Sequence, residues 1–244
     1  MTEYLAQPFE RPYYAHCVWN AAVLGKRLGY PAISVVEFGV AGGNGLVLLE
    51  KYATEISTEI GIEIQVYGFD TAEGLPAPVD YRDIPYYWQP GAFHMDEAAL
   101  RSRLTHAELV LGDIRETSKT FFEKYQPAPL AAVFHDMDLY SSTKAGLEMF
   151  HADEKYRLPR VFCFFDDIFG DELTLCCDFT GERLAINEFN ESNEMKKISP
   201  AYYLQIRPVF PGSPYIYIFH DFAHSRYNDF VGPPNQELPL APNP

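Results

Sequence analysis

Three aspartates stand where apolar, strand-like runs end, and their positions suggest a cation site. Asp136 closes the run LAAVFHD, and Asp166 and Asp167 close VFCFFDD. In an open parallel sheet, ligands bind outside the carboxyl ends of the strands, so neighbouring strands would bring these carboxylates together. Close negative charges raise one another's pKa unless a cation neutralises them, and an all-oxygen site suits Mg²⁺. We therefore predict that the three bind Mg²⁺ or a similar divalent cation, with helix N-capping as the alternative.

A fourth aspartate, Asp138, follows two residues after Asp136 in the sequence DMDLYSST. A carboxylate beside a metal-bound hydroxyl could take up its proton, so we predict Asp138 as a general base. Its alternative role is to cap the helix expected to follow. His94, His220 and His224 are further candidates for a base, although most isolated histidines are structural or solvated.

Residues 35–45 read VVEFGVAGGNG, which is a glycine-rich turn after an apolar strand. Glycines let the backbone approach a ligand closely, and carboxylates suit a cofactor that carries an ammonium, a sulfonium and a ribose diol. Glu37 before Gly39, and Asp70 after the next strand, therefore favour S-adenosylmethionine. The interval of 31 positions between Gly39 and Asp70 (70 minus 39) exceeds the ~20 of dinucleotide-binding folds, which disfavours a nicotinamide dehydrogenase. A turn without a ligand is the remaining alternative.

The predicted cofactor contacts lie at the ends of several strands and are Glu37, Phe38, Gly39, Gly43, Asp70, Thr71, Gly112, Asp113 and Asp136. Gly112 and Asp113 follow a third strand, where an acid could accept a hydrogen bond from an adenine amino group. The same pair is equally typical of a plain turn, because both residue types favour turns.

Residues 76–90 form a long loop rich in proline and aromatic residues. Long loops in compact domains are often lids or binding surfaces. We predict that Tyr86, Tyr87 and Trp88 cover a bound substrate and exclude water. Plain packing or a contact between subunits would use the same side chains.

These residues require a framework of alternating strands and helices. Periodicity predicts helices over 13–28, 46–60, 96–104, 118–125 and 142–150, and strands over 33–38, 62–69, 109–111, 130–135 and 161–165. Alternating residues over 202–209 and 215–219 predict a C-terminal antiparallel hairpin. This order predicts an α/β, Rossmann-like fold with a mostly parallel seven-stranded sheet closed by that hairpin.

Composition limits the partners. The chain has 244 residues and a formal net charge of −15, so we expect no nucleic acid as partner and favour a small, neutral or basic acceptor. No apolar run approaches the ~20 residues of a membrane span, and no secretion signal is evident, so we expect a cytoplasmic protein without a membrane partner. We expect one domain over 1–231 and a proline-rich tail over 232–244, and we keep a homo-oligomer as a hypothesis.

Seven segments occur in the order seen in the macrocin O-methyltransferase family, which includes the mycinamicin and novobiocin sugar O-methyltransferases. They are EFGVAGGNG, YGFDTAEGLP, WQPGAF, GDIRET, HDMDLYSST, FFDDIFG and GERLAINEF. The chain resembles this family over about residues 35–189, and the segments FDTAEGLP and DLYSST are the most specific. His135 and Met137 depart from the residues usual in the family at those positions.

The resemblance implies a class I methyltransferase that transfers a methyl group to a hydroxyl with the help of Mg²⁺, often on a sugar of a natural product. It implies Asp136, Asp166 and Asp167 as metal ligands and Asp138 as the base. Glu37, Gly39, Asp70 and Asp113 are implied as cofactor contacts. A metal bound to two acceptor oxygens would require a diol-like acceptor. The alternatives are a metal-independent N- or C-methyltransferase and a non-catalytic interaction protein on the same fold.

Overall fold

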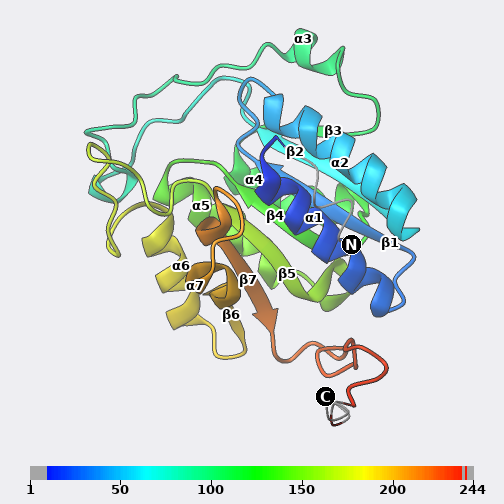
Figure 1. The fold of residues 1–244 in the computed structure, drawn as a ribbon. Helices are drawn as coiled ribbons and strands as arrows, with labels where there is room; N and C mark the ends of the chain where they lie inside the picture. The colour runs from blue at the N-terminus through cyan, green and yellow to red at the C-terminus, as the bar shows by residue number, and fades with distance from the viewer. Residues whose placement is uncertain (1–9, 238–239, 241–244) are drawn as a thin grey trace.

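A computed structural model describes residues 10–237 and 240 of the chain (Figure 1). The strands are β1 Ala32–Phe38, β2 Glu63–Asp70, β3 Glu108–Leu111, β4 Leu130–His135, β5 Arg157–Phe165, β6 Lys196–Pro200 and β7 Ile216–Asp221. The helices are α1 Pro12–Arg27, α2 Asn44–Ile60, α3 Glu97–Arg101, α4 Ile114–Tyr125, α5 Tyr140–Leu147, α6 Gly181–Ser192 and α7 Tyr202–Ile206. Short 3₁₀ turns are η1 Tyr81–Asp83, η2 Glu148–His151, η3 Glu154–Tyr156 and η4 Ser213–Tyr215.

The strands form one seven-stranded sheet in the order β3-β2-β1-β4-β5-β7-β6. The pairs β3–β2, β2–β1, β1–β4 and β4–β5 are parallel, whereas β7 runs antiparallel to both β5 and β6. The predicted mostly parallel sheet with a C-terminal antiparallel pair is therefore confirmed. β1 is the middle one of the five parallel strands, with β2 and β3 on one side of it and β4 and β5 on the other. The strand order therefore reverses at β1, and the crevice beyond its carboxyl end is the expected place for a ligand.

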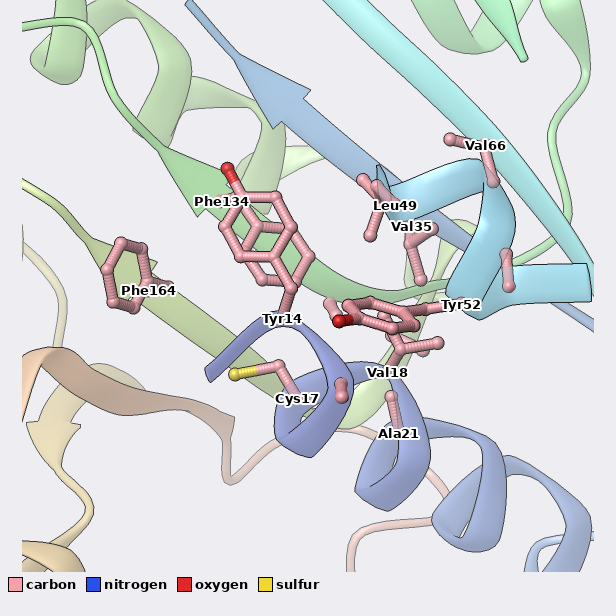
Figure 2. Close-up of a cluster of buried hydrophobic side chains, with 14 of the residues drawn as sticks. Tyr14, Cys17, Val18, Ala21, Val35, Leu49, Tyr52, Val66, Phe134 and Phe164 are labelled. Carbon is pink, nitrogen blue, oxygen red and sulfur yellow. The ribbon is translucent and has the colours of Figure 1, made fainter. Parts of the chain in front are cut away.

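Helices cover both faces of the sheet and bury two apolar clusters. On one face α1 and α2 lie side by side, and in Figure 2 Tyr14 and Val18 of α1 point towards Val35, Phe134 and other residues of the strands. On the other face α4, α5 and α6 pack on a second cluster that includes Phe38, Phe165 and Phe219. Burial on both faces explains why the central strands read as continuous apolar runs.

The predicted C-terminal hairpin was wrong in its first strand. Residues 202–206 form the short helix α7, and the partner of β7 is the earlier segment β6. The register pairs Pro200 with Tyr217, and the chain then leaves the sheet. Within α7 Leu204 is buried while Tyr202 and Ile206 are exposed, which a strand with these three residues on one face would not allow. Pro208 follows and lacks the N–H that a longer strand would need.

Other boundaries shift for local reasons. Helix α4 begins at Ile114 rather than at 118, because the carboxylate of Asp113 accepts a hydrogen bond from the Arg115 N–H and caps it. Helix α5 begins at Tyr140, and its predicted last turn is the 3₁₀ turn η2. Helix α6 was not predicted from periodicity at all.

The ends of the chain add little regular structure. Residues 232–237 form neither helix nor strand, and residues 238–239 and 241–244 of the predicted tail lie outside the described part of the chain. The division into one domain and a tail stays a prediction. Every helix in the described residues is too short or too polar for a bilayer crossing.

Candidate functional site

The predicted site residues meet along one edge of the sheet, where the parallel strands end. Backbone hydrogen bonds of 2.9 to 3.0 Å continue the strand pairing one residue further, from Gly112 to Asp70, Gly39 to Phe69, Asp136 to Phe38 and Asp166 to His135. Neighbouring strands are about 4.8 Å apart, and Asp70 ends β2 between Gly112 and Gly39, so the four donor residues and Asp70 form a continuous row. The sequence prediction that strand ends bring glycines and carboxylates together is consistent with this row.

The turn requires glycine at two positions, because neighbouring atoms come too close there for a side chain. Gly39 has a φ of 82°, and a Cβ added to it would lie 1.7 Å from the carbonyl oxygen of Asp136. A Cβ on Gly45 would lie 2.0 Å from Glu37 Oε1. Glycine at these positions therefore lets the turn touch β4 and lets the Glu37 carboxylate lie against α2.

A cavity of about 390 Å³ opens above this row, within the size range of small-molecule sites. Of the predicted site residues, those that line it are Glu37, Gly39, Gly43, Asp70, Thr71, Trp88, Gly112, Asp113, Asp136, Asp138, Asp166 and Asp167. Phe38, Tyr86 and Tyr87 do not line the cavity. The Phe38 side chain instead packs with Phe69 in the cluster on the opposite face of the sheet.

Asp70 already accepts two backbone hydrogen bonds that shape the cavity. Its Oδ2 accepts from the Ala41 N–H at 2.8 Å, and its Oδ1 accepts from the Ala72 N–H at 2.6 Å. Ala41 and Ala72 have positive φ values of 47° and 63°. The Asp70 carboxylate therefore holds two strained turns in place, and its predicted contact with a ribose stays a prediction.

Glu37 is different, because one of its carboxylate oxygens has no partner. Its side chain is buried, and Oε1 accepts a hydrogen bond of 2.6 Å from the Tyr14 hydroxyl, while Oε2 has no hydrogen-bond partner among the described residues. Burial raises the pKa of Glu37 to about 7, against the opposing effects of the Tyr14 hydrogen bond and the charge of Arg11. Arg11 also lines the cavity. Sequence analysis missed Arg11 and Tyr14, because nothing in their spacing connects them with the glycine turn.

Four carboxylates line the other end of the cavity, those of Asp136, Asp138, Asp166 and Asp167, and a fifth, that of the buried Glu182, lies beside Asp167 without lining it. Burial is the largest cause of a raised pKa at each of them, and it brings the pKa of Asp138 to about 7. Neighbouring carboxylates add to the effect at all but Asp166. Glu182, at the start of α6, was not predicted, and its Oε2 accepts a 3.0 Å hydrogen bond from the Asp167 N–H.

The all-oxygen composition of this acid cluster fits a hard divalent cation. Its positions do not form a finished coordination shell: within residues 10–237 and 240, no three His, Cys, Asp or Glu side chains converge in a way that could hold a metal ion. The carboxylate oxygens are therefore the right type of ligand for Mg²⁺, but their positions do not form a complete site.

Asp138 does not cap helix α5. The residue at the N-cap is Leu139, without a side-chain cap, so the capping alternative for Asp138 is wrong. Asp138 has a φ of 61°, and its N–H donates to Asp167 Oδ2 at 3.1 Å. This backbone leaves the Asp138 carboxylate in the cavity wall.

The aromatic loop is tied to the body of the protein by a buried acid that sequence analysis overlooked. Asp83 accepts hydrogen bonds from the Val79 N–H at 2.7 Å and from the N–H and hydroxyl of Ser141 at 2.7 and 2.9 Å. The loop is closed at its base, where the Leu75 N–H donates to the Ala92 carbonyl at 2.8 Å. The loop is thus anchored at its base and against the start of α5.

The three predicted loop aromatics have separate surroundings. Trp88 lines the cavity, and its buried indole N–H has no partner among the described residues. The hydroxyl of Tyr86 donates to the Thr174 carbonyl at 2.8 Å, and that of Tyr87 donates to Asp171 Oδ2 at 3.3 Å. Tyr86 and Tyr87 therefore join the loop to residues 171–174, and only Trp88 faces the cavity.

The remaining candidates are peripheral. Neither His94, which is exposed, nor His220, which hydrogen-bonds to Tyr227, nor the buried His224 lines the cavity. His135 is fully buried in the core, and burial lowers its pKa to about 3, so it is a neutral core residue. Asp113 lines the cavity, but it also caps α4 and pairs with Arg115. Its structural role at the start of α4 is therefore established, and its contact with an adenine stays a prediction.

The chain shares its fold with a solved methyltransferase and is more distantly similar to others. The calicheamicin methyltransferase CalS11 superposes with a TM-score of 0.54 at 22% identity, covering 83% of this chain and 77% of that chain. An apo structure of CalS11, a TDP-rhamnose 3′-O-methyltransferase, gives 0.49 at 20% identity over 83% and 78%. An O-methyltransferase from Bacillus cereus in complex with SAH gives 0.46 at 14% identity over 88% and 82%.

The sequence matches no protein-family model, and no curated protein is significantly similar to it. The fold assignment therefore rests on the first of these structures. The chain has the Rossmann-like fold of the class I methyltransferases, as predicted. At this level of identity the similarity defines the fold and leaves the activity to be argued from the site.

Proposed function

We propose that this protein is an S-adenosylmethionine-dependent methyltransferase that methylates a hydroxyl of a small molecule. The observation that carries the proposal is the buried Glu37 carboxylate, which has an unpartnered oxygen beside the glycine turn in the wall of the cavity. A buried carboxylate without a partner is costly unless a ligand supplies one. S-adenosylmethionine carries an ammonium that can do so, and when bound it supplies an activated methyl group.

The acid cluster supports oxygen as the methylated atom. A hydroxyl must lose its proton when it is methylated, and Asp138 lies in the cavity wall with its pKa raised by burial to about 7. A carboxylate with such a pKa can accept a proton near neutral pH. CalS11, whose fold this chain shares, is a calicheamicin methyltransferase, which supports a small molecule as the acceptor.

We infer a divalent cation, by preference Mg²⁺, as an additional requirement. Asp136, Asp166 and Asp167 would hold it through their carboxylate oxygens, and it would lower the pKa of an acceptor hydroxyl. The crowding of negative charge supports this inference, because a cation would relieve the repulsion that adds to the raised pKa of Asp136 and Asp167.

The charges also restrict the acceptor. Seven carboxylates line the cavity against two guanidinium groups, those of Arg11 and Arg115, and Arg115 pairs with Asp113. A nucleotide-linked sugar brings a diphosphate, which this field would repel. We therefore expect a neutral or basic diol-like acceptor, with the free indole N–H of Trp88 as a donor to one of its oxygens.

The first experiment is calorimetric titration with S-adenosylmethionine and with its demethylated product. Binding in the micromolar range is expected. Absence of binding would instead favour the non-catalytic alternative.

The second experiment screens small hydroxylated acceptors with methyl-labelled cofactor, with and without chelator. Labelled ether that appears only with Mg²⁺ is expected, and it should be lost in Asp166→Ala. Full transfer under complete chelation, with label on nitrogen or carbon, would favour the metal-independent alternative. Light scattering on the same sample would test the predicted homo-oligomer.

A further inference from the structure

Arg11 lines the cavity and has no role so far in the proposed reaction. It occupies the N-cap of α1 with a left-handed φ of 47°, so the chain turns there before the helix begins. Its guanidinium lines the cavity, and its Nη1 donates a 3.2 Å hydrogen bond to the Tyr14 hydroxyl. Among the described residues it forms no ion pair. The other arginine of the cavity wall, Arg115, is paired with Asp113.

Tyr14 connects this cation with the buried acid. Its ring is fully buried in α1, 4.2 Å from the ring of Phe134 on β4, and this pair is visible in Figure 2. The packing fixes the phenol oxygen, which donates to Glu37 Oε1 at 2.6 Å and accepts from Arg11. A positive and a negative group are therefore held on either side of one oxygen atom without pairing directly with each other.

Both charged groups keep free hydrogen-bonding capacity. Glu37 Oε2 is buried and has no partner among the described residues. A guanidinium has five N–H donors in a planar fork, which suits a carboxylate with two parallel hydrogen bonds. The pair therefore presents an acceptor for an ammonium and a fork for a carboxylate, side by side at the glycine turn.

That pattern is complementary to an α-amino acid, whose ammonium and carboxylate are attached to the same carbon. We propose that Glu37 and Arg11 bind the ammonium and the carboxylate of the methionine half of S-adenosylmethionine, with the Tyr14 hydroxyl setting their spacing. This inference rests on the proposed function. It assigns Arg11 as the residue that distinguishes the complete cofactor from nucleosides that lack the amino acid.

The test compares two ligands on three proteins. Calorimetry measures the binding of S-adenosylhomocysteine, which has the amino acid, and of 5′-methylthioadenosine, which has the same nucleoside without it. In Arg11→Gln we expect S-adenosylhomocysteine to bind roughly 10- to 100-fold more weakly, since one charge-assisted pair is lost, and 5′-methylthioadenosine to bind as in the wild type. Arg27→Gln, at the other end of the same helix, is the matched control and should change neither affinity.

Two further variants keep the test decisive if Arg11→Gln is poorly folded. Arg11→Lys keeps the charge but not the fork, so an intermediate loss confined to S-adenosylhomocysteine is expected. Tyr14→Phe should weaken the same ligand while leaving 5′-methylthioadenosine unchanged.

Equal losses for both ligands, or no loss for either, in Arg11→Gln would overturn the role of Arg11. Wild-type protein that binds neither ligand would instead refute the proposed function itself. The two failures are therefore distinguishable in one titration series.

Discussion

The two ends of the cavity differ in how their carboxylates are satisfied. We call the end beside the glycine turn the donor end, because the proposed methyl donor would bind there, and the end at the acid cluster the acceptor end. At the donor end Asp70 accepts hydrogen bonds from two backbone N–H groups, and Glu37 accepts one from the Tyr14 hydroxyl. At the acid cluster, no donor among the described residues reaches the carboxylate oxygens of Asp136 or Asp138. Folding alone thus completes most of the donor end, whereas the acceptor end needs protons or a cation from outside. Under the proposed function, the same cavity therefore combines a preorganised site for the cofactor with carboxylates that lack donors at the place of the reaction.

The largest effect is expected from a substitution at the contact that joins the two ends of the cavity. Gly39→Ala places a Cβ against the carbonyl oxygen of Asp136 at a positive φ, so we expect a loss of more than about 3 kcal/mol in the free energy of unfolding and no cofactor binding. Denaturant unfolding and calorimetry measure these effects.

The matched control lies in the same turn. Gly42 has nothing within 4 Å of an added Cβ, so Gly42→Ala should unfold at nearly the same denaturant concentration as the wild type. Similar behaviour of the two variants would show that the contact at Gly39 is not what holds the turn against β4.

The next largest effect should be confined to the acid cluster. Asp138→Asn removes the proton acceptor but keeps a residue type that tolerates the φ of 61°. We expect kcat to fall about 10²- to 10⁴-fold while calorimetric affinity for the cofactor stays unchanged. A parallel loss of cofactor binding would place Asp138 at the donor end and contradict the division.

A smaller effect is expected from the anchor of the aromatic loop. Asp83→Ala leaves the N–H groups of Val79 and Ser141 without their acceptor, so we expect about 2–3 kcal/mol of destabilisation and a raised KM for the acceptor. Limited proteolysis within residues 76–90 would report the released loop. Asp80→Ala, a partly exposed acid of the same loop, should destabilise the protein clearly less than Asp83→Ala, and equal costs would refute the anchoring role.

The smallest effect concerns the pH dependence of cofactor binding. Glu37, with a pKa of about 7, faces Tyr14, Arg11, Asp70 and Asp166. Because this pKa lies above the ordinary value of 4.5, the folded state favours protonated Glu37, and the stability that this contributes is lost as the pH rises through 7. A bound ammonium favours the ionised form, so affinity should rise about fivefold from pH 6 to pH 7.

The control for this slope is Glu37→Gln, which removes the titration without changing the shape. Calorimetry at the two pH values should show a clearly smaller rise in this variant. An unchanged slope would assign the titration to the acid cluster and not to Glu37.

Sequence could predict the parts of the molecule that depend on short segments. Buried strands are apolar runs, and the residues that follow them must meet at one edge, so Gly39, Asp136 and Asp166 could be placed together without a structure. The antiparallel closure of the sheet was predicted as well. Residues 202–209 were wrongly predicted as a strand, because an alternation of residue types does not reveal which of the side chains are buried.

Sequence could not predict contacts that join distant segments. Arg11 and Tyr14 precede the glycine turn by more than twenty positions, and only the packing of α1 on β4 brings the phenol to Glu37. The buried Asp83 accepts a hydrogen bond from Ser141, and the buried Glu182 accepts one from Asp167. The loops that bring these residues together have no periodic pattern from which their paths could be predicted. Such residues have ordinary neighbours in the sequence, so their types alone carry no signal.

The contact between Gly39 and the Asp136 backbone has a consequence for engineering. It joins the donor end and the acceptor end by main-chain atoms, whose positions do not depend on which side chains surround them. The loop of residues 76–90, part of which lines the cavity, attaches outside this joint. Under the proposed function, loops grafted from other sources would therefore change which acceptor is methylated while the line of methyl transfer stays fixed.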